Sequence, residues 1–468
     1  MLDWTVLAFE RWCRTNVHRT SRLARLTRPW FIRHVSRAKL VHALRHVWLN
    51  CPAQRERWRN AGLRLGDLRS PEVLPRIPFT EPVELAEHPE TFCCVPTDQL
   101  THVFTTTGTK GTPKKVYVTE DDFERQVKLI GTFLHEFRAV GGGGRALAMF
   151  NIDLPTWSAG TVARRGIEEA GLFGLLSPTS HTARQQIALI REYHINILLS
   201  MPAYVHRLTL EAADDGVDLT TLGVRIIQVG GQAWSERFRR DIEQAWAAKL
   251  IDSYGSMECV CGTASECVEQ DGLHVAELEF WVEIVDPDTG EVLPDGTEGE
   301  VVLTTLSRRG MPLVRYRTRD LARLLPRGKR CACGLPTRKM SRVRGRLDDT
   351  IIIGGDANVF ADEWDRAFLS IPGVSDYELT VTKNGYKDVL NLRVEGDVDN
   401  PALAERVAEA FYTIPHVKIP LTQTLTAAVG DIEIVPRGAL SAGRPKSRRI
   451  VDERETPTFV TLERKETS

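Results

Sequence analysis

The sequence predicts an α/β protein: a large N-terminal domain with mixed parallel and antiparallel sheets, and a small, mobile α+β domain at the C-terminus. First, the 468 residues exceed the usual size of one compact core. Second, short apolar runs alternate with helical patterns after Thr101, as in parallel-sheet units. Third, a charged, Gly-containing run at 344–349 precedes the tail, so we place the domains at residues 1–347 and 348–468.

The first 99 residues or so favour helices. Apolar residues recur at helical spacing at Leu40, Leu44, Val47 and Trp48, which predicts an amphipathic helix packed on the main body. Ten arginines and Lys39, but no acidic residue, occur between positions 10 and 56. Such a block is also found in transit peptides and membrane-surface helices, but Trp and Pro residues interrupt it and Ser is sparse. We therefore favour the packed helix.

The stretch from about 101 to 347 predicts a parallel sheet followed by an antiparallel one. Buried parallel strands are expected at 146–152, 195–200 and 224–229, and helices at 182–193 and 235–246. From 278 to 305 the pattern becomes β alternation with turns at 286–290 and 294–296, which predicts antiparallel strands.

The tail predicts a small α+β unit. Strands at 378–382 and 389–394 flank Lys383-Asn384-Gly385 as a hairpin, a helix is expected at 401–412, and a late strand at 432–435.

Composition narrows the function classes. Hydrophobic residues make up 42% and charged residues 26%, the balance of a globular protein. Sixty-one basic and 62 acidic side chains give a net charge of −1, which argues against a chain that coats nucleic acid or membrane. Nine cysteines do not form an extracellular disulfide pattern, and no secretory signal or membrane-length apolar run occurs. We expect a cytoplasmic protein with small-molecule partners; whether it forms a homodimer is left open.

A Thr/Gly-rich loop follows the apolar residues 102–104. Glycines let several N–H groups point at one anion, threonine hydroxyls add donors, and lysine compensates phosphate charge. The alternative is an ordinary polar surface loop. The loop consists of Thr105, Thr106, Thr107, Gly108, Thr109, Lys110, Gly111, Thr112, Pro113 and Lys114.

Four later motifs follow the loop in order. They are Val229-Gly230-Gly231-Gln232-Ala233-Trp234, Tyr254-Gly255-Ser256-Met257-Glu258, Tyr316-Arg317-Thr318-Arg319-Asp320 and Gly345-Arg346-Leu347-Asp348-Asp349. Together with the loop, they resemble the motifs of the adenylate-forming superfamily of acyl-CoA synthetases, adenylation domains and luciferases. The nearest branch is the phenylacetate-CoA ligase type. The resemblance implies ATP, Mg²⁺ and, in this branch, CoA.

The resemblance also implies roles for single residues. It makes Glu258 a Mg²⁺ ligand, Asp320 and Arg346 ribose contacts, Tyr254 an adenine contact and Asp348 the hinge. The catalytic residues would be Thr106, Lys114, Glu258 and Lys446, the last on the small domain. The remaining nucleotide contacts would be Thr105, Thr107, Gly108, Thr109, Lys110, Gly111, Gly230, Gly231, Gln232 and Gly255. Phe150 and Trp157 either line an aromatic-acid pocket or fill the core.

A close thiolate pair suggests a metal site. Cys331 and Cys333 lie two residues apart, and Cys267 and His274 lie upstream in the same antiparallel region. Three thiolates and an imidazole suit tetrahedral Zn²⁺, and a site with four protein ligands would be structural. Free thiols are the alternative. Cys259 and Cys261 compete as ligands, and we rank Cys267 above both.

The leading hypothesis is an AMP-forming ligase that activates an aromatic (aryl or arylacetic) carboxylic acid as acyl-adenylate and transfers it to CoA. The alternative is an adenylating enzyme of specialised metabolism with another acceptor: an amine, a carrier-protein thiol, or nitrite in N–N bond formation. A nucleotide-binding relic is disfavoured because Glu258, Asp320 and Lys446 are all present.

Overall fold

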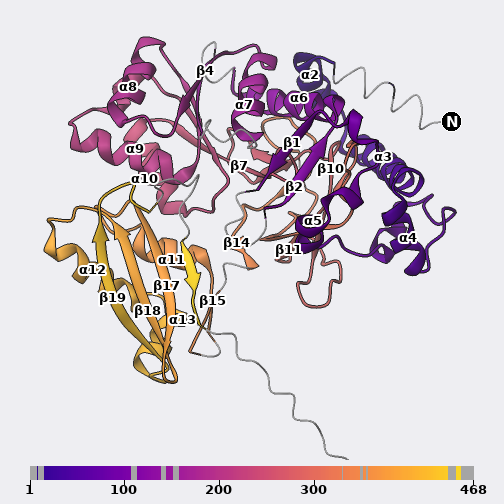
Figure 1. Cartoon of the computed structure of the whole chain (residues 1–468). Helices are drawn as coiled ribbons and strands as arrows, with labels where there is room; N and C mark the ends of the chain where they lie inside the picture. The colour runs from indigo at the N-terminus through magenta and orange to yellow at the C-terminus, as the bar shows by residue number, and fades with distance from the viewer. Residues whose placement is uncertain are drawn as a thin grey trace, which may run out of the picture. The chain divides into compact units, whose positions relative to one another are not determined.

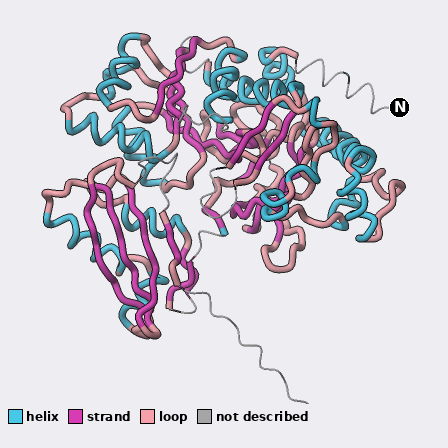
Figure 2. Tube along the Cα trace, viewed as in Figure 1, coloured by secondary structure: helices cyan, strands magenta, loops and turns pink. Residues whose placement is uncertain are grey.

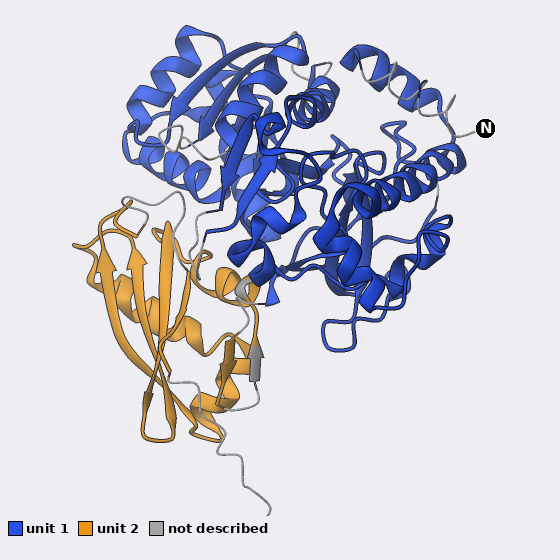
Figure 3. Ribbon diagram, turned by 45° about the vertical axis from the view of Figure 1, so that its right-hand side comes forward, with its two compact units in different colours: residues 1–348 blue, residues 349–468 orange. Residues whose placement is uncertain are grey.

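The chain divides into two compact units, residues 1–348 and 349–468 (Figure 3). The boundary expected from the sequence, at 347/348, is one residue away from this division. The computed structural model describes Ala8 and residues 15–106, 113–138, 144–150, 158–328, 330–347, 351–354, 357–440 and 449–454.

Helices dominate the start of the first unit (Figure 1). They are α2 (Val17–Leu26), α3 (Pro29–Asn50), α4 (Pro52–Asn60), α5 (Pro82–Glu87) and the 3₁₀ turns η1 (Pro71–Arg76), η2 (Pro89–Phe92) and η3 (Thr97–Gln99). Pro29 begins α3, where its missing N–H has no helical partner to lose. The four apolar residues of the predicted amphipathic helix are all buried in α3, around Trp58 of α4, which confirms that helix. Among the described residues, no helix is long and apolar enough to cross a bilayer.

The largest sheet has eight strands in the order β13-β9-β8-β7-β6-β5-β3-β4. Neighbours from β4 to β7 are parallel, whereas β7, β8, β9 and β13 pair antiparallel. The three predicted parallel strands are present as β3, β5 and β6. The strands are β3 (Arg145–Phe150), β4 (Phe173–Pro178), β5 (Ile197–Ser200), β6 (Ile226–Gly230), β7 (Lys249–Ser256), β8 (Cys261–Glu266), β9 (Leu273–Val275) and β13 (Lys339–Met340).

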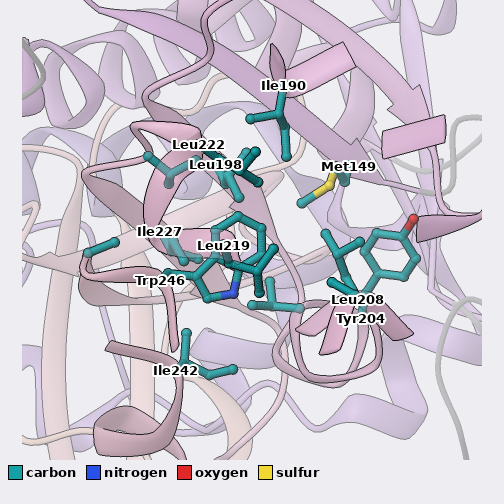
Figure 4. Close-up of a cluster of buried hydrophobic side chains, with 14 of the residues drawn as sticks. Met149, Ile190, Leu198, Tyr204, Leu208, Leu219, Leu222, Ile227, Ile242 and Trp246 are labelled. Carbon is teal, nitrogen blue, oxygen red and sulfur yellow. The ribbon is translucent and has the colours of Figure 1, made fainter. Parts of the chain in front are cut away.

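Alternate side chains of the parallel strands enter two separate cores. Leu147, Leu198 and Ile227 pack with helices α8 (Ala183–Glu192), α9 (Pro202–Asp214) and α10 (Glu236–Trp246), as Figure 4 shows in part. Their strand neighbours pack with α6 (Glu120–Phe137) and α7 (Ser158–Glu169) in the other core. The period of two along each strand therefore places helices on both faces of the sheet. The turn η4 (Leu219–Leu222) completes the first core.

Two antiparallel arrangements complete the first unit. A four-stranded sheet has the order β10-β11-β12-β14, which confirms the antiparallel prediction for 278–305. Its strands are β10 (Phe280–Val285), β11 (Gly299–Thr305), β12 (Tyr316–Ala322) and β14 (Gly345–Arg346). Strands β1 (His102–Thr105) and β2 (Lys115–Val118) form a short hairpin, and the Thr/Gly-rich loop connects them.

The second unit contains a four-stranded sheet, a separate two-stranded antiparallel sheet and helices (Figure 2). The predicted hairpin is formed by β17 and β18, while β19 and β20 add to its two sides in parallel. Buried aromatic rings of Trp364, Phe368, Tyr377 and Phe411 lie in its core. The elements are β15 (Ile351–Ile353), β16 (Ala357–Val359), α11 (Ala361–Phe368), β17 (Asp376–Asn384), β18 (Lys387–Glu395), α12 (Pro401–Phe411), α13 (Pro415–Thr422), β19 (Ala427–Val435) and β20 (Ile450–Asp452).

Candidate active site

The base of the Thr/Gly-rich loop is closed by two hydrogen bonds. The N–H of Thr106 donates to the carbonyl of Lys114 at 3.0 Å, and the N–H of Lys114 donates to Oγ1 of Thr106 at 3.0 Å. Thr105, at the end of β1, pairs with Lys115 at the start of β2. Thr107, Gly108, Thr109, Lys110 and Gly111 lie outside the described residues. The hairpin therefore sets where the loop begins and ends.

Lys114 meets two residues from distant motifs. Its Nζ lies 2.6 Å from Oε1 of Glu258 and donates to the Tyr316 hydroxyl at 3.2 Å. The Tyr316 hydroxyl donates to the same Oε1 of Glu258 at 2.7 Å. Glu258 and Tyr316 are buried, and Lys114 is partly buried. The end of the loop, the turn after β7 and the start of β12 thus converge on one carboxylate oxygen.

The surroundings of Glu258 keep it anionic. Burial by itself would raise the pKa of Glu258, but the charge and hydrogen bond of Lys114 and the hydrogen bond from Tyr316 lower it to about 2. Arg308 is also buried, and its Nη1 donates to the Glu258 carbonyl at 2.6 Å. A buried, charged carboxylate beside a phosphate-type loop is a suitable hard oxygen ligand for Mg²⁺.

A glycine near the end of β7 allows β8 to approach closely before Glu258. A Cβ at Gly255 would lie 1.8 Å from the carbonyl oxygen of Cys261, so only glycine fits where the paired strands β7 and β8 come this close. The β7–β8 register shifts between Tyr254 and Gly255, as expected for a β-bulge. This irregularity places Glu258 in a buried turn between the two strands.

The predicted ribose and adenine residues also come together. The Tyr254 hydroxyl donates to Oδ2 of Asp320 at 2.7 Å, and Nε of Arg346 donates to Oδ1 of Asp320 at 3.0 Å. Asp320 and Arg346 are partners in the β12–β14 register. Burial, followed by the charge of Asp320, raises the pKa of Tyr254 well above its usual value. Tyr254 therefore remains a hydrogen-bond donor at neutral pH.

The Gly230-Gly231-Gln232 stretch begins with the last residue of β6 and continues beyond it. A Cβ at Gly230 would lie 2.5 Å from Oγ of Ser253, which excludes a larger side chain there. Gln232 Oε1 accepts the N–H of Ala203 at 3.3 Å, so the described contact of this side chain is with α9. The stretch lies beside the end of β7, next to Tyr254.

Some predicted residues cannot be placed. Lys446, Asp348 and Trp157 lie outside the described residues. Phe150 ends β3 and is partly buried, which leaves its assignment to a pocket or to the core a prediction.

Sequence reasoning missed the roles of Tyr316 and Arg308. Tyr316 begins the motif that ends in Asp320, and no spacing rule indicates that the Tyr316 hydroxyl reaches Glu258, 58 positions earlier. Arg308 belongs to no motif used in the prediction.

The four predicted metal ligands form one cluster in the first unit. The ligand atoms of Cys267, His274, Cys331 and Cys333 all lie within 4.8 Å of one another. The Sγ atoms of Cys267 and Cys331 are 3.7 Å apart, and Cys333 Sγ lies 3.4 Å from His274 Nε2. Tetrahedral bonds of about 2.3 Å to sulfur and about 2.0 Å to nitrogen separate such ligands by about 3.8 and 3.5 Å.

The hydrogen bonds around this cluster favour metal ligation. His274 Nδ1 lies 3.0 Å from Oγ1 of Thr337, an interaction that leaves Nε2 directed at the thiols. The hydrogen bond from Cys333 lowers the pKa of Cys267. The neighbouring Cys259 and Cys261 are not members of the cluster among the described residues. The residues present therefore fit Zn²⁺ in ligand type and spacing.

Comparison with known proteins gives a consistent result. Residues 37–307 match the family described as AMP-binding enzyme. The chain is 34% identical over 363 residues to a phenylacetate-coenzyme A ligase of Pseudomonas putida, covering 76% of this chain and 80% of the relative. It is 29% identical over 438 residues to the phenylacetate-coenzyme A ligase of Thermus thermophilus, covering 91% and 97%.

A solved structure shares the fold. The crystal structure of a 2-hydroxyisobutyryl-CoA ligase in the postadenylation state superposes with a TM-score of 0.74 at 21% identity, covering 90% of this chain and 89% of that one. At this identity the likeness concerns the fold alone. It agrees with the predicted α/β class with mixed sheets.

Proposed function

This chain belongs to the AMP-binding enzyme family, and on that premise we propose that it joins an aryl or arylacetic acid to coenzyme A, with ATP converted to AMP and pyrophosphate. The convergence of Lys114, Tyr316 and Glu258 at the base of the phosphate-type loop carries the proposal. The phenylacetate-coenzyme A ligase relatives support the choice of acid and of acceptor.

The first half-reaction joins two anions. An oxygen of the acid attacks the α-phosphorus of ATP, and the bond to pyrophosphate breaks. Lys114 lies where it can pair with phosphate oxygens, and Glu258 would hold Mg²⁺. When bound, the metal supplies positive charge that compensates the phosphates. Asp320 would accept a hydrogen bond from a ribose hydroxyl. Arg346 and Tyr254 hold the two carboxylate oxygens of Asp320 in place.

The second half-reaction forms the thioester. The CoA sulfur attacks the acyl carbon of the adenylate, a C–S bond forms, and AMP leaves with the oxygen of the broken acyl–phosphate link. We propose Lys446 as the lysine of the small unit that acts in adenylation and Asp348 as the hinge, with Phe150 and Trp157 lining the acid pocket. This part of the proposal rests on the motif resemblance.

One experiment tests the proposed reaction. AMP release from ATP is measured across aromatic and aliphatic acids, with CoA, with an amine, with nitrite and with no acceptor. We expect arylacetic or aryl acids to support AMP release that depends on CoA, together with an acyl-CoA product. Turnover that needs an amine or nitrite in place of CoA would establish a different acceptor.

A variant tests the assigned lysine. Lys446→Ala should abolish acid-dependent exchange of pyrophosphate into ATP, with ATP affinity close to that of the unmodified protein. Undiminished exchange would rule out this assignment.

We also propose that the cluster of Cys267, His274, Cys331 and Cys333 holds a structural Zn²⁺. The cluster joins the end of β8 and strand β9 to the segment before β13, so the ion would link separate parts of the first unit. Elemental analysis should find about one zinc per chain, as four ligands to one ion require. A Cys331→Ser protein that keeps all its zinc would contradict the ligand set.

Location and assembly are part of the proposal. We propose a cytoplasmic enzyme, since its substrates ATP and CoA are cytoplasmic metabolites, and a homodimer is the assembly to test. Cell fractionation and light scattering of the purified chain measure these two properties.

A further inference from the structure

A network of charged side chains surrounds Trp234, at the end of one nucleotide motif. Trp234, the last residue of the predicted adenine stretch, is buried. The guanidinium carbon of Arg342 lies 3.5 Å from the Trp234 ring centroid, and that of Arg239 lies 4.9 Å from it. Both distances are within the range of cation–π attraction.

Asp252 links the same residues to strand β7. Its Oδ1 accepts a hydrogen bond from the Nε1–H of Trp234 at 3.3 Å. Its Oδ2 forms an ion pair with Nε of Arg342 at 3.3 Å. The Asp252 N–H donates to Glu266 at 2.8 Å, and Glu266 in turn accepts two hydrogen bonds from Arg239 at 2.9 and 3.0 Å. The network is therefore closed across the end of the adenine stretch, β7, β8 and α10.

Arg342 connects this network to the ribose side. It donates to the Trp234 carbonyl and to Glu236. Four residues later on the same segment, Arg346 holds Asp320. The segment between them is bound along β12, where the N–H of Arg344 donates to the carbonyl of Leu321 at 2.9 Å. A segment hydrogen-bonded to β12 thus has one arginine on the adenine stretch and another on the ribose carboxylate.

We propose that Arg342, held by Asp252, is a positioning residue for ATP, because it fixes the adenine stretch at Trp234 relative to the ribose carboxylate Asp320. The inference rests on the proposed adenylating function, in which Arg342 itself touches no reacting atom. Its loss should weaken ATP binding and leave the acid site and the chemical step nearly unchanged.

The network should also respond to pH. Burial raises the pKa of Asp252 to about 6, against the charge of Arg342 and the hydrogen bond from Trp234, and the negative charge of Glu266 raises it further. Arg239 is the remaining charged group that faces it. As the pH falls through about 6, Asp252 becomes neutral and its attraction for Arg342 is lost.

Arg342→Met removes the charge and keeps a long side chain. We expect KM and Kd for ATP to rise about tenfold, the effect of losing one charge-assisted contact, with kcat and the KM for the acid within about twofold. Arg342→Lys keeps a charge without the planar fork, so it should recover part of the affinity. The matched control is Arg237→Met, since Arg237 is an exposed α10 residue paired with Asp241 at 3.3 Å.

The measurements are ATP–pyrophosphate exchange, calorimetric titration with ATP, and melting temperature. In the unmodified protein, KM for ATP should rise below about pH 6, and Asp252→Asn should make it high at every pH. Unchanged ATP affinity in Arg342→Met, or an equal loss for ATP and acid, would overturn the inference. A lack of exchange in the unmodified protein would instead reject the proposed function, while titration with ATP still tests Arg342.

Discussion

Two buried carboxylates in the first unit face cations, yet their pKa values are shifted in opposite directions. The pKa of Glu258 is lowered to about 2, whereas that of Asp252 is raised to about 6. Burial opposes the charged form in both. Glu258 has Lys114 at 2.6 Å and the Tyr316 hydroxyl at 2.7 Å on a single oxygen. Asp252 has longer contacts of 3.3 Å with Arg342 and Trp234, and the carboxylate of Glu266 lies nearby.

Both carboxylates are buried, so the difference between their pKa values comes from the length of their contacts and from the charges of their neighbours. The close donors at Glu258 outweigh desolvation, while the 3.3 Å contacts at Asp252 do not, because the negative charge of Glu266 adds to the effect of desolvation there. Glu258 suits a permanent role as an anionic ligand. Asp252 suits a role that varies with pH.

The largest expected effect separates these roles. Glu258→Gln keeps the shape but removes the charge that would bind the proposed Mg²⁺ ion, and it takes from Lys114 the carboxylate of its ion pair. We expect kcat for ATP–pyrophosphate exchange to fall about 100- to 1000-fold, the cost of losing a central electrostatic contact. Asp252→Asn should change mainly the KM for ATP. Similar losses of kcat in both variants would remove the distinction between the two regions.

An intermediate effect is expected from Tyr316→Phe. The variant removes the hydroxyl that donates a hydrogen bond to Glu258 and keeps the aromatic ring. The position of the Glu258 carboxylate is then fixed by one hydrogen bond fewer. The half-saturating Mg²⁺ concentration should rise about three- to tenfold, as for one hydrogen bond to a charged group. Mn²⁺ binding measured by electron paramagnetic resonance gives a readout that is independent of activity.

Tyr204→Phe is the matched control for that variant. Tyr204 is also a buried tyrosine of the first unit, and its hydroxyl accepts Nε2 of Gln186 at 2.9 Å, in a core away from Glu258. An equal shift of metal affinity in both variants would show a general packing effect.

The smallest effect concerns stability. The ordinary Asp value is 3.8 and the folded value of Asp252 is about 6, so the folded state binds this proton more tightly than the unfolded state. The resulting stability is present below the unfolded value and is lost as the pH rises through about 6. Between pH 7 and pH 5 the unmodified protein should gain about 1 kcal/mol relative to Asp252→Asn in urea unfolding. Parallel pH profiles of the two proteins would contradict the raised pKa.

Much of the fold could be predicted because its signals are local. The apolar runs of β3, β5 and β6 and the helical spacing of Leu40, Leu44 and Val47 predicted elements that the structure contains. The predicted β17–β18 hairpin is also present, but Lys383 and Asn384 extend β17 and the turn lies at Gly385 and Tyr386. The antiparallel extension of the main sheet through β8 and β9 was not predicted, because β8 consists mostly of small and polar residues and β9 has only three residues.

The sequence by itself determined the order of the motifs and hence the family, the identity of the candidate ligands and the chemistry those side chains can perform. Only the tertiary structure decided that Tyr316 shares an oxygen of Glu258 with Lys114, that Cys267 joins the Cys/His cluster and Cys259 does not, and that Arg342 reaches Trp234. The sequence specifies the chemical type of each side chain. Distance, burial and the resulting charge state arise only when distant segments pack together, and these quantities separate Glu258 from Asp252.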